Sequence, residues 1–393
     1  MPSQSTQHKH RHGGLRRLFF SLLFLSLVAA LGSCSLTKRS NSGPITFGIA
    51  AGRNGVQGAK LAVEQINASG GIKGRELKLD VAENGDADSA ELSIAIATQY
   101  LDSPQILAVI GHPNSPATLA SSQLYNERHL VQLVPNATSP LLTEAGPWTF
   151  RLCMSDTLQG RQLADYAVKQ MGAHTIAILF VNDDYGKGLK DVFYDRAKEL
   201  GASITMVSPF DSGPEFTPIL DYMKQTRPDF LFLALRTGSL MTVGRWLSQH
   251  NFHPKLLAGD SVNQWQLQRD DRVMRELNGL RHTIFFWPTS MDAKVQEFVR
   301  AYQQKYQRPP DDEAALNYDA VFLLKRAAEK GTATRQGIRD YLDSVGAANP
   351  AFEGVAGRVA FDRNGDSDKA LQLAVIKDGK MVPLDSSAET SRQ

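Results

Sequence analysis

The sequence is poor in cysteine and has almost no net charge. It holds two cysteines, Cys34 and Cys153, in 393 residues, which allows at most one internal disulfide. The formal charge is +2, but four basic residues and no acidic residue stand in the first seventeen positions, which leaves 39 basic residues against 41 acidic ones. A body so close to neutral offers no basic face to nucleic acid. We therefore expect no nucleic-acid partner.

Motifs of catalysis and metal binding are also missing. The sequence has no G-x-S-x-G elbow, no H-E-x-x-H and no P-loop. The run GGIKG (70–74) resembles half of a dinucleotide fingerprint, but it follows a helical pattern rather than a strand. Residues 362–368 imitate a calcium loop, yet Leu373 stands where a bidentate Glu is needed, so a polar hairpin turn is the better interpretation. The histidines lack metal-ligand spacing. We expect no enzyme activity, no cofactor and no metal.

The N-terminal segment has the pattern of an export signal. A basic, His-rich stretch (8–17) precedes an apolar run (18–30). That run is shorter than the roughly 20 residues that span a bilayer and suits a signal peptide. It ends in Leu-Gly-Ser-Cys, which resembles the bacterial lipobox, where the Cys receives a diacylglycerol and the chain is cut before it. The sequence thus predicts a lipoprotein signal peptide over 1–33, lipidation of Cys34 and an extracytoplasmic (periplasmic) protein anchored to the membrane.

Two alternatives stay open for this segment: an ordinary signal peptide with a chance cysteine, or a membrane anchor that is never cut. The pair Arg16-Arg17 suggests twin-arginine export, whereas the strongly apolar run favours the general secretory route. Lipidation of Cys34 would leave Cys153 as a buried structural thiol. Residues 34–44 are polar without periodicity, which is typical of a flexible tether.

The body of the chain alternates between strand and helix patterns. Helical spacing is clearest from Val56 to Ile66, over 90–101 and from Leu189 to Leu200. Several of the apolar runs lack polar alternation, as expected of parallel strands covered on both faces. The alternation predicts an α/β fold with helices on both faces of each sheet. The strands are expected at 45–50, 77–82, 106–110, 130–134, 175–181, 204–207 and 230–235.

Two strand-to-helix junctions carry an unusual set of polar residues. In GHPNSPAT (111–118) we expect Gly111 to permit close backbone approach and Ser115 or Thr118 to cap the next helix. The stretch LVPNATSPLLT (133–143) repeats the arrangement, with Pro140 entering a second helix. Helix N-termini attract carboxylates, and a hydroxyl adds a donor, so the pair predicts an anion site at the carboxyl ends of the strands. The alternative is two capped helix starts without a ligand.

These stretches resemble the periplasmic binding proteins of the leucine/isoleucine/valine type, the substrate-binding subunits of ABC importers. The resemblance covers about 45–385, with the motifs in family order. They are AVEQINASGGIKGREL (62–77), VIGHPNSPAT (109–118), VPNATSPLLTEAG (134–146), FR…SDTLQGRQLADY (150–166), NDDYGKGL (182–189), EAALNYDAVFLL (313–324) and FEGVAGRVAFDRNGD (352–366).

The resemblance implies two doubly wound parallel-sheet lobes joined by three crossovers, with a ligand cleft between them. The crossovers are expected near 151–156, 284–290 and 357–362. Lobe 1 is expected to hold 45–153 and 289–358, and lobe 2 to hold 154–288 and 359–388.

The resemblance also implies roles for six residues. Ser115 and Thr138 would offer hydroxyl and backbone N–H groups to a ligand carboxylate. The carbonyl near Ser115 or Ala137 would help hold an ammonium, with Asn136 in the same loop. Tyr185 would close over the ligand, and Asp260 would pair with the ammonium.

The function that the resemblance implies is capture of an amino acid or similar small polar solute for the permease subunits of an ABC importer. Two alternatives remain: a ligand-sensing module for a membrane receptor, and a binder of an amide, urea or an anionic acid. The loop AAGRNGVQG (50–58) is shorter than the family's usual version, which puts branched-chain specificity in doubt. It places Arg53 and Asn54 near the cleft mouth, and Arg53 or Arg236 would favour an anionic ligand there. The family's common cysteine pair is absent.

Overall fold

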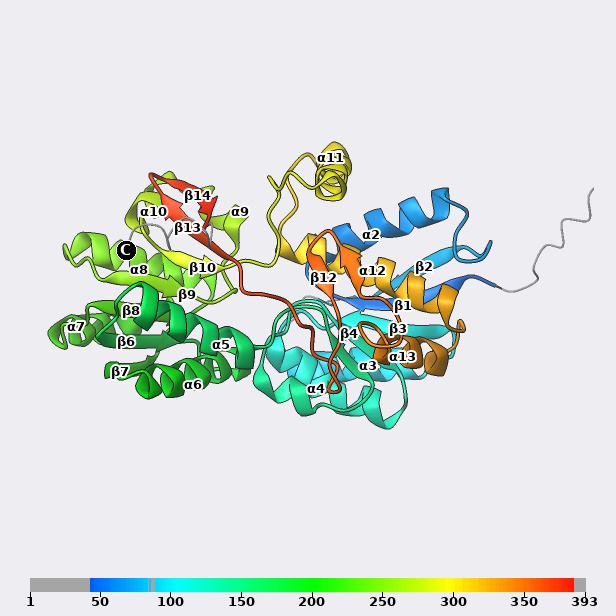
Figure 1. The fold of residues 1–393 in the computed structure, drawn as a ribbon, viewed down its shortest axis with the longest axis horizontal. Helices are drawn as coiled ribbons and strands as arrows, with labels where there is room; N and C mark the ends of the chain where they lie inside the picture. Colours follow the sequence, from blue (N-terminus) through cyan, green and yellow to red (C-terminus); the bar gives the residue numbers. More distant parts are fainter. Residues whose placement is uncertain (1–42, 84, 86–88, 385–393) are drawn as a thin grey trace, which may run out of the picture. The chain divides into compact units, whose positions relative to one another are not determined.

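The computed structural model describes residues 43–83, 85 and 89–384 (Figure 1). The predicted signal peptide, Cys34 and residues 34–42 of the predicted tether lie outside this range. Within the described range, every helix is too short or too polar to cross a membrane.

The first sheet has five parallel strands in the order β2-β1-β3-β4-β5. The strands are β1 (Ile45–Ala50), β2 (Leu77–Val81), β3 (Ile106–Gly111), β4 (Val131–Val134) and β5 (Thr149–Arg151). The helices between them are α2 (Arg53–Ala68), α3 (Ala90–Leu101), α4 (Ser115–Glu127) and the 3₁₀ helix η1 (Pro140–Glu144).

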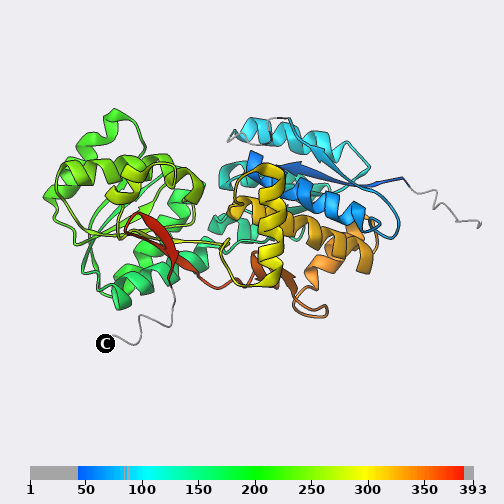
Figure 2. The same ribbon diagram turned by 90° about the horizontal axis from the view of Figure 1, so that it is seen from above.

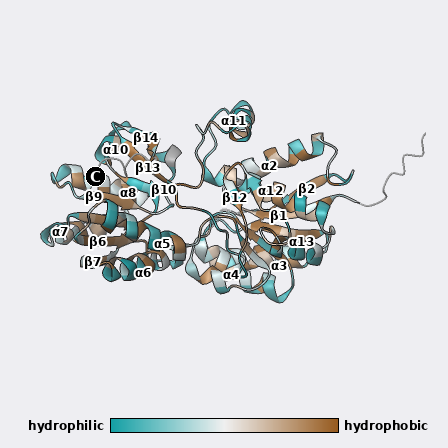
Figure 3. Ribbon diagram, in the orientation of Figure 1, coloured by the Kyte–Doolittle hydropathy of each residue, from teal (hydrophilic) through white to brown (hydrophobic). Residues whose placement is uncertain are grey.

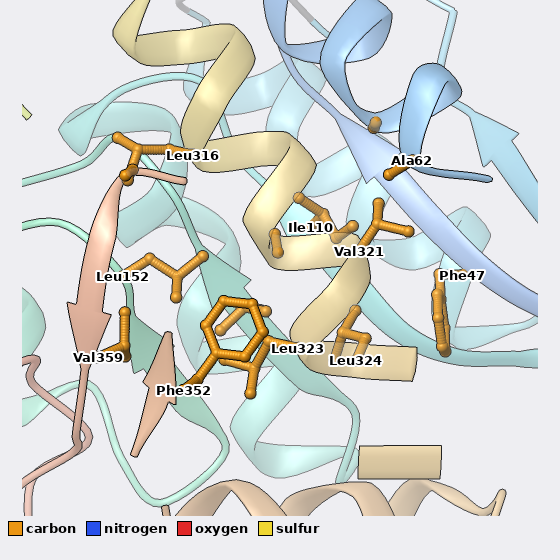
Figure 4. Close-up of a cluster of buried hydrophobic side chains, with 14 of the residues drawn as sticks. Phe47, Ala62, Ile110, Leu152, Leu316, Val321, Leu323, Leu324, Phe352 and Val359 are labelled. Carbon is orange, nitrogen blue, oxygen red and sulfur yellow. The ribbon is translucent and has the colours of Figure 1, made fainter. Parts of the chain in front are cut away.

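A later part of the chain returns to this sheet and completes lobe 1. It contributes α11 (Ala293–Tyr306), α12 (Asp312–Lys330), α13 (Arg335–Asp343) and a hairpin of β11 (Phe352–Gly354) and β12 (Gly357–Val359). Figure 2 shows the orange α12 beside the blue α2, and both helices share one apolar core with the sheet. In that core Val321 and Leu324 lie near Phe47 and Ile110 (Figure 4).

The second sheet has seven strands in the order β14-β13-β10-β9-β8-β6-β7 and forms lobe 2. The strands are β6 (Thr175–Phe180), β7 (Ser203–Pro209), β8 (Phe230–Ala234), β9 (Lys255–Ala258), β10 (Arg281–Thr283), β13 (Leu373–Lys377) and β14 (Lys380–Pro383). The helices are α5 (Asp156–Asp165), the π-helical turn η2 (Tyr166–Gln170), α6 (Asp184–Glu199), η3 (Pro214–Phe216), α7 (Thr217–Gln225), α8 (Thr237–Gln249), α9 (Gln264–Leu267) and α10 (Asp271–Glu276). Unlike the predicted all-parallel lobe, this sheet ends in the antiparallel pair β13 and β14.

The central strands of each sheet are buried on both faces, which explains why they read as continuous apolar runs. In β8 the side chains of Phe230 and Phe232 enter the core under α5 and α6, while Leu231 and Leu233 enter the core under α7 and α8. Successive residues of a strand point to opposite faces, so a strand covered twice needs apolar residues at every position. Figure 3 shows the brown, hydrophobic colour along β1 and β6 and teal on the outer helices α6 and α7. The predicted α/β class with two lobes is confirmed.

The third crossover lies later than the sequence predicts. Residues 359–362 are expected to begin lobe 2, but Phe361 packs in the core of lobe 1 and pairs with Ser367 across a turn. Asp366 then bridges to Arg151 at the end of β5. The chain reaches the second sheet only at β13, which begins at Leu373, fourteen residues after the expected start of lobe 2 at 359. The crossover lies later because the buried Arg151 binds the polar turn that contains Asp366, which keeps this turn on lobe 1.

Candidate functional site

A cavity of about 210 Å³ lies where the carboxyl ends of strands from both sheets supply residues. Its lining follows β3, β4, β6, β8 and β9, with Phe285 from the second crossover and the start of α12. Loops beyond the carboxyl ends of parallel strands are where α/β folds bind ligands. The lining residues are Pro113, Asn114, Ser115, Asn136, Thr138, Tyr185, Arg236, Asp260, Ser261, Val262, Asn263, Phe285, Asp311, Asp312 and Glu313.

The first predicted loop enters α4 as expected, but with a different cap. Asn114 Oδ1 accepts the backbone N–H of Ala117 at 3.0 Å and is the N-cap, so the prediction of Ser115 or Thr118 is wrong. Thr118 is buried and donates its hydroxyl to the carbonyl of His112. Ser115 is the first helical residue and lines the cavity, and its Oγ accepts the N–H of Ser139 at 3.2 Å. The bond to Ser139 uses a lone pair of Ser115 and not its hydroxyl proton.

Gly111 permits close approach of a strand rather than of a ligand. Its φ is +131°, a region that favours glycine. A Cβ at this position would also meet the carbonyl oxygen of Ala50 at the end of β1. The glycine therefore lets β3 turn into the ligand loop directly beside β1.

The second predicted loop does not lead into an α-helix. Pro140 opens the 3₁₀ helix η1, which spans five residues and is capped by Ser139. Of its predicted residues, Asn136 and Thr138 line the cavity, whereas Ala137 is buried outside the lining. The Ala137 carbonyl accepts the thiol of Cys153 at 3.3 Å and so has a partner already. The prediction of two α-helix termini converging on one anion is thus wrong for the second loop.

A buried arginine supports this loop from behind. Arg151 is 1% exposed and donates from Nη1 to the carbonyls of Thr138 and Ser139 at 2.8 and 2.7 Å. Its Nε donates to Asp366 at 2.8 Å, and Nη2 pairs with the same carboxylate and donates to Thr143 Oγ1. One guanidinium therefore ties the ligand loop to the turn at the third crossover. The predicted calcium-like run supplies Asp366 to this arginine.

Asp260 and Tyr185 belong to a buried polar network at one end of the cavity. Gln159 Nε2 donates to Asp260 at 2.9 Å and to Asp156 at 2.8 Å, and Thr138 Oγ1 donates to Asp156 at 2.8 Å. Burial raises the pKa of Asp260 to about 6, against the lowering effect of its bonds from Gln159 and Tyr185. Burial and the charge of Asp260 raise the pKa of Asp156 well above its usual range. Thr138 therefore gives its hydroxyl proton to a carboxylate and keeps only lone pairs for other partners.

Three consecutive acids at the start of α12 also line the cavity. Asp311 Oδ1 caps the helix by accepting the N–H of Ala314 at 3.0 Å. Asp312 Oδ2 accepts the N–H of Phe285 at 3.0 Å. Burial, with the charges of Asp311 and Asp260, raises the pKa of Asp312 to about 7, and burial and Asp311 raise that of Glu313 to about 7. These carboxyls hold part of their protons near neutral pH.

One guanidinium lines the cavity among the residues the structure describes. Arg236 pairs with Asp183 at 2.7 Å, which satisfies much of its charge. Arg53 is not part of the lining, although the sequence places it near the cleft mouth. Asn54 donates to Asp311 and accepts from Arg308. The short first loop thus supports the α12 acids and does not bring Arg53 to the site.

The acids of α12 are not among the site residues predicted from the sequence. The stretch PPDDEAALNYD contains an acidic first turn before an apolar helical pattern, which ordinarily marks a helix N-terminus and its dipole. That pattern explains the acids without any ligand, so it gave no reason to place them in the site. Three carboxylates at one helix start, more than a cap requires, were the available signal.

The profile of the family described as "Periplasmic binding protein" matches residues 40–380. The chain belongs to this family. A Leu/Ile/Val-binding protein homolog 1 from Brucella abortus is 26% identical over 367 residues, which is 90% of this chain and 94% of that protein. An ABC transporter substrate-binding protein from Desulfitobacterium hafniense, solved in complex with Leu, is 32% identical with a TM-score of 0.73, and the match covers 87% of this chain and all of that one.

Periplasmic binding proteins with other ligands share the fold. A solute-binding protein of an ABC transporter from R. palustris, solved in complex with benzoate, has a TM-score of 0.76 at 18% identity, covering 87% of this chain and 96% of that one. This likeness concerns the fold alone. The family is one of solute-binding proteins rather than enzymes. Membership in a periplasmic family implies an extracytoplasmic location.

Proposed function

We propose that the protein is a lipid-anchored solute-binding protein that captures an amino acid or a similar small zwitterion between its lobes and delivers it to the permease subunits of an ABC importer. The observation that carries the proposal is the cavity itself, where neutral donors at the start of α4 and the carboxylate of Asp260 contribute to one lining. The carboxylate of the ligand lies at Ser115 and the start of α4, and its ammonium lies at Asp260 and Tyr185.

The anion end of the site is supported by a helix terminus and a hydroxyl. α4 has thirteen residues, and its first N–H groups carry the positive end of the helix dipole. Ser115 keeps its hydroxyl proton for a ligand because its bond to Ser139 uses a lone pair. Asn136 adds an amide to the same part of the lining. These groups are neutral donors, which suits a carboxylate that must also leave the site.

The cation end is supported by an excess of acceptors. Asp260 and Asp156 share the amide of Gln159, with one further hydroxyl each, from Tyr185 to Asp260 and from Thr138 to Asp156, and the Oε1 atom of Gln159 is buried without a hydrogen-bond partner. A ligand ammonium would supply three donors at this point. Because the ligand then contacts both lobes, it stabilises the closed arrangement more than the open one.

A thermal-shift screen of the detergent-purified full chain tests this function. The panel holds amino acids, small amides, urea and aromatic acids. A ligand at a hundred times its dissociation constant adds about 2.7 kcal/mol of stability, which is a clear shift in melting temperature. We expect amino acids to give the largest shift. A larger shift from benzoate or another aromatic acid would contradict the proposed ligand class, and no shift from any solute would contradict the function.

Anchoring through Cys34 is tested by mass spectrometry of the membrane fraction. The wild-type protein should begin at Cys34 with acyl chains attached, and Cys34→Ser should be uncut at that site and carry no lipid. Recovery of unmodified wild-type protein after washing without detergent would contradict the lipid anchor and leave the solute-binding function untouched.

A further inference from the structure

The cavity is much more acidic than a site for a simple zwitterion needs. Four carboxylates line it, from Asp260, Asp311, Asp312 and Glu313. Asp156 lies directly behind them, linked to Asp260 through Gln159. The lining guanidinium, Arg236, already pairs with Asp183. One ligand ammonium can neutralise Asp260, but the acids at the start of α12 remain.

The bonds that hold the α12 acids come from neutral groups. Asp311 accepts a backbone N–H of its own helix, and Asp312 accepts the N–H of Phe285. Glu313 lies against Gly52 at the start of α2. Burial raises the pKa of Glu313 more than the backbone N–H groups there and the charge of Arg308 lower it. These donors fix the two carboxyl groups in place but do not offset the effect of burial, which leaves both pKa values raised to about 7. Bringing a cation to such carboxylates is favourable because burial has weakened their contact with water.

Two buried amides beside the cavity show the same excess of acceptors. Asn317 and Gln159 are both fully buried, and Oδ1 of Asn317 and Oε1 of Gln159 have no hydrogen-bond partner in the described part of the chain. Each amide donates its N–H to a residue of the lining, Asn317 to Asn136 at 3.1 Å and Gln159 to Asp260 at 2.9 Å. Asn317 belongs to α12 and Gln159 to α5, so the two amides reach the lining from different helices. Buried acceptors left unpaired are costly, so a ligand rich in donors is favoured beside either amide.

Few residues of the lining are apolar in character. Of its fifteen residues, three are apolar: Pro113, Val262 and Phe285. A leucine side chain placed here would cover carboxylates without giving them a hydrogen bond. The same lining would repel the charge of an acidic or aromatic carboxylate beyond the one held at α4.

We propose that the solute carries a second cationic group, an ammonium or guanidinium on its side chain, as in the basic amino acids, and that this group binds the carboxylates of Asp312 and Glu313. This inference rests on the proposed function, because it uses the same site and the same orientation of the α-amino acid end. Phe285 and Pro113 then contact the apolar stem between the two charged ends. Asp312 and Glu313 are specificity-determining residues in this arrangement.

Calorimetric titration of the detergent-purified full chain tests the second cation. The probes are L-arginine, L-lysine, L-leucine, L-glutamate and L-citrulline, whose side chain has nearly the shape of arginine without its charge. We expect arginine or lysine to bind at least about tenfold more tightly than citrulline and leucine, because hydrogen bonds to charged groups are the stronger ones.

Two single variants test whether Asp312 and Glu313 bind the second cation. Glu313→Gln and, separately, Asp312→Asn should each reduce the affinity ratio of arginine to citrulline by about tenfold. Glu329→Gln, at the other end of α12 and paired with Lys325, is the matched control and should leave the ratio unchanged. The ratio is the readout because loss of a helix contact would weaken both probes together, whereas loss of a charge pair weakens arginine alone.

Leucine, citrulline or glutamate binding as tightly as the cationic probes would overturn the inference while the solute-binding function stands. Tight cation binding with an unchanged ratio in both variants would overturn the assignment to Asp312 and Glu313. Absence of binding by every probe, together with a screen that finds no other solute, would overturn the function and the inference together.

Discussion

Two helix starts meet at the cavity with the same capping geometry, but one cap is a neutral amide and the other a carboxylate. At α4, Asn114 Oδ1 accepts the N–H of Ala117 at 3.0 Å, and at α12, Asp311 Oδ1 accepts the N–H of Ala314 at 3.0 Å. We call Asn114, Ser115, Asn136 and Thr138 the neutral lining, and Asp260, Asp311, Asp312 and Glu313 the acidic lining. A helix capped by an amide keeps its dipole available to an incoming anion, whereas one capped by carboxylates is already complemented. The choice of cap thus decides which end of a zwitterion each helix can accept.

The two linings also differ in what supports them. Behind the neutral lining lies a buried cation, Arg151, which holds the carbonyls of Thr138 and Ser139. The acidic lining is held by backbone N–H groups and by the amide of Gln159. Arg151 therefore shapes a loop from outside the lining, and the guanidinium that does line the cavity, that of Arg236, pairs with Asp183, whereas the carboxylates of the acidic lining can face the ligand.

Removing the support of the neutral lining should have the largest effect. Arg151→Met leaves Asp366 and two carbonyls without their donor, and breaking a buried ion pair by removing one partner costs about 3–5 kcal/mol. We expect a large drop in the melting temperature of the ligand-free protein. Arg128→Met, which removes an exposed pair with Asp102, is the control and should change little. Equal melting temperatures for the two variants would contradict a structural role for Arg151.

Removing one charge from the acidic lining should weaken binding without harming the fold. Asp260→Asn keeps the shape and removes a hydrogen bond to a charged group, worth about 1.5–3 kcal/mol, so affinity should fall by roughly one to two decades. The ligand-free variant should be at least as stable as the wild type, because burial disfavours the charged form of Asp260. Titration of the best ligand from the screen measures the affinity, with the exposed Asp271→Asn as control. An unchanged affinity in Asp260→Asn would show that the ligand ammonium does not bind at Asp260.

The acidic lining should also make stability depend on pH. Burial and the charge of Asp311 raise the pKa values of Asp312 and Glu313 to about 7, above the values of the unfolded chain. The charge of Asp260 also raises the pKa of Asp312, and the charge of Arg308 lowers that of Glu313. The folded protein then binds more protons than the unfolded chain, so its stability falls as pH rises from the unfolded pKa through 7.

The effect is at most about 1.4 kcal/mol per pH unit for each group. The useful window is pH 6.5 to 8, because the buried His282, whose pKa is lowered to about 4, gives an opposite trend below 6.5. Melting temperatures of the ligand-free protein should decline across this window, less steeply in Glu313→Gln and unchanged in slope for Glu329→Gln. A wild-type slope in Glu313→Gln would show that this carboxyl does not titrate there.

Removing one hydroxyl from the neutral lining should have the smallest effect. Ser115→Ala loses a hydrogen bond between a neutral and a charged group, but the backbone N–H of residue 115 and the dipole of α4 remain, so we expect a loss of about 1 kcal/mol or less in binding. Ser121→Ala, on the same helix and bonded to Ala117, should leave affinity unchanged. A loss for Ser115→Ala greater than that for Asp260→Asn would reverse the comparison between the two linings.

The fold was largely predictable from periodicity. The apolar runs at 45–50, 106–110 and 230–235 are strands in the structure. They could be predicted because a strand that is buried on both faces needs apolar residues at successive positions. The third crossover was not predictable, since the turn at 361–367 reads as a solvent-exposed loop until Arg151 is seen to bind Asp366. Long-range ion pairs of this kind leave no local signal in the sequence.

The site was predictable only in part. Five of the six predicted ligand residues line the cavity, because loops at the carboxyl ends of strands converge. Ala137 is buried outside the lining, and its carbonyl accepts the thiol of Cys153. Their roles toward a ligand stay predictions. The acids at 311–313 could not be placed, because a helix start explains them equally well and only the return of α12 to the first sheet brings them to the cavity.

The most direct test of the account is a comparison of three forms of the best amino acid from the screen: the free acid, its primary amide and its N-acetyl derivative. The amide removes the negative charge that the neutral lining should receive, and acetylation removes the positive charge that Asp260 should receive. Titration of the wild-type protein should show each derivative binding at least about tenfold more weakly than the free amino acid. Equal affinity for the free acid and either derivative would contradict the assignment of opposite ligand charges to the two linings.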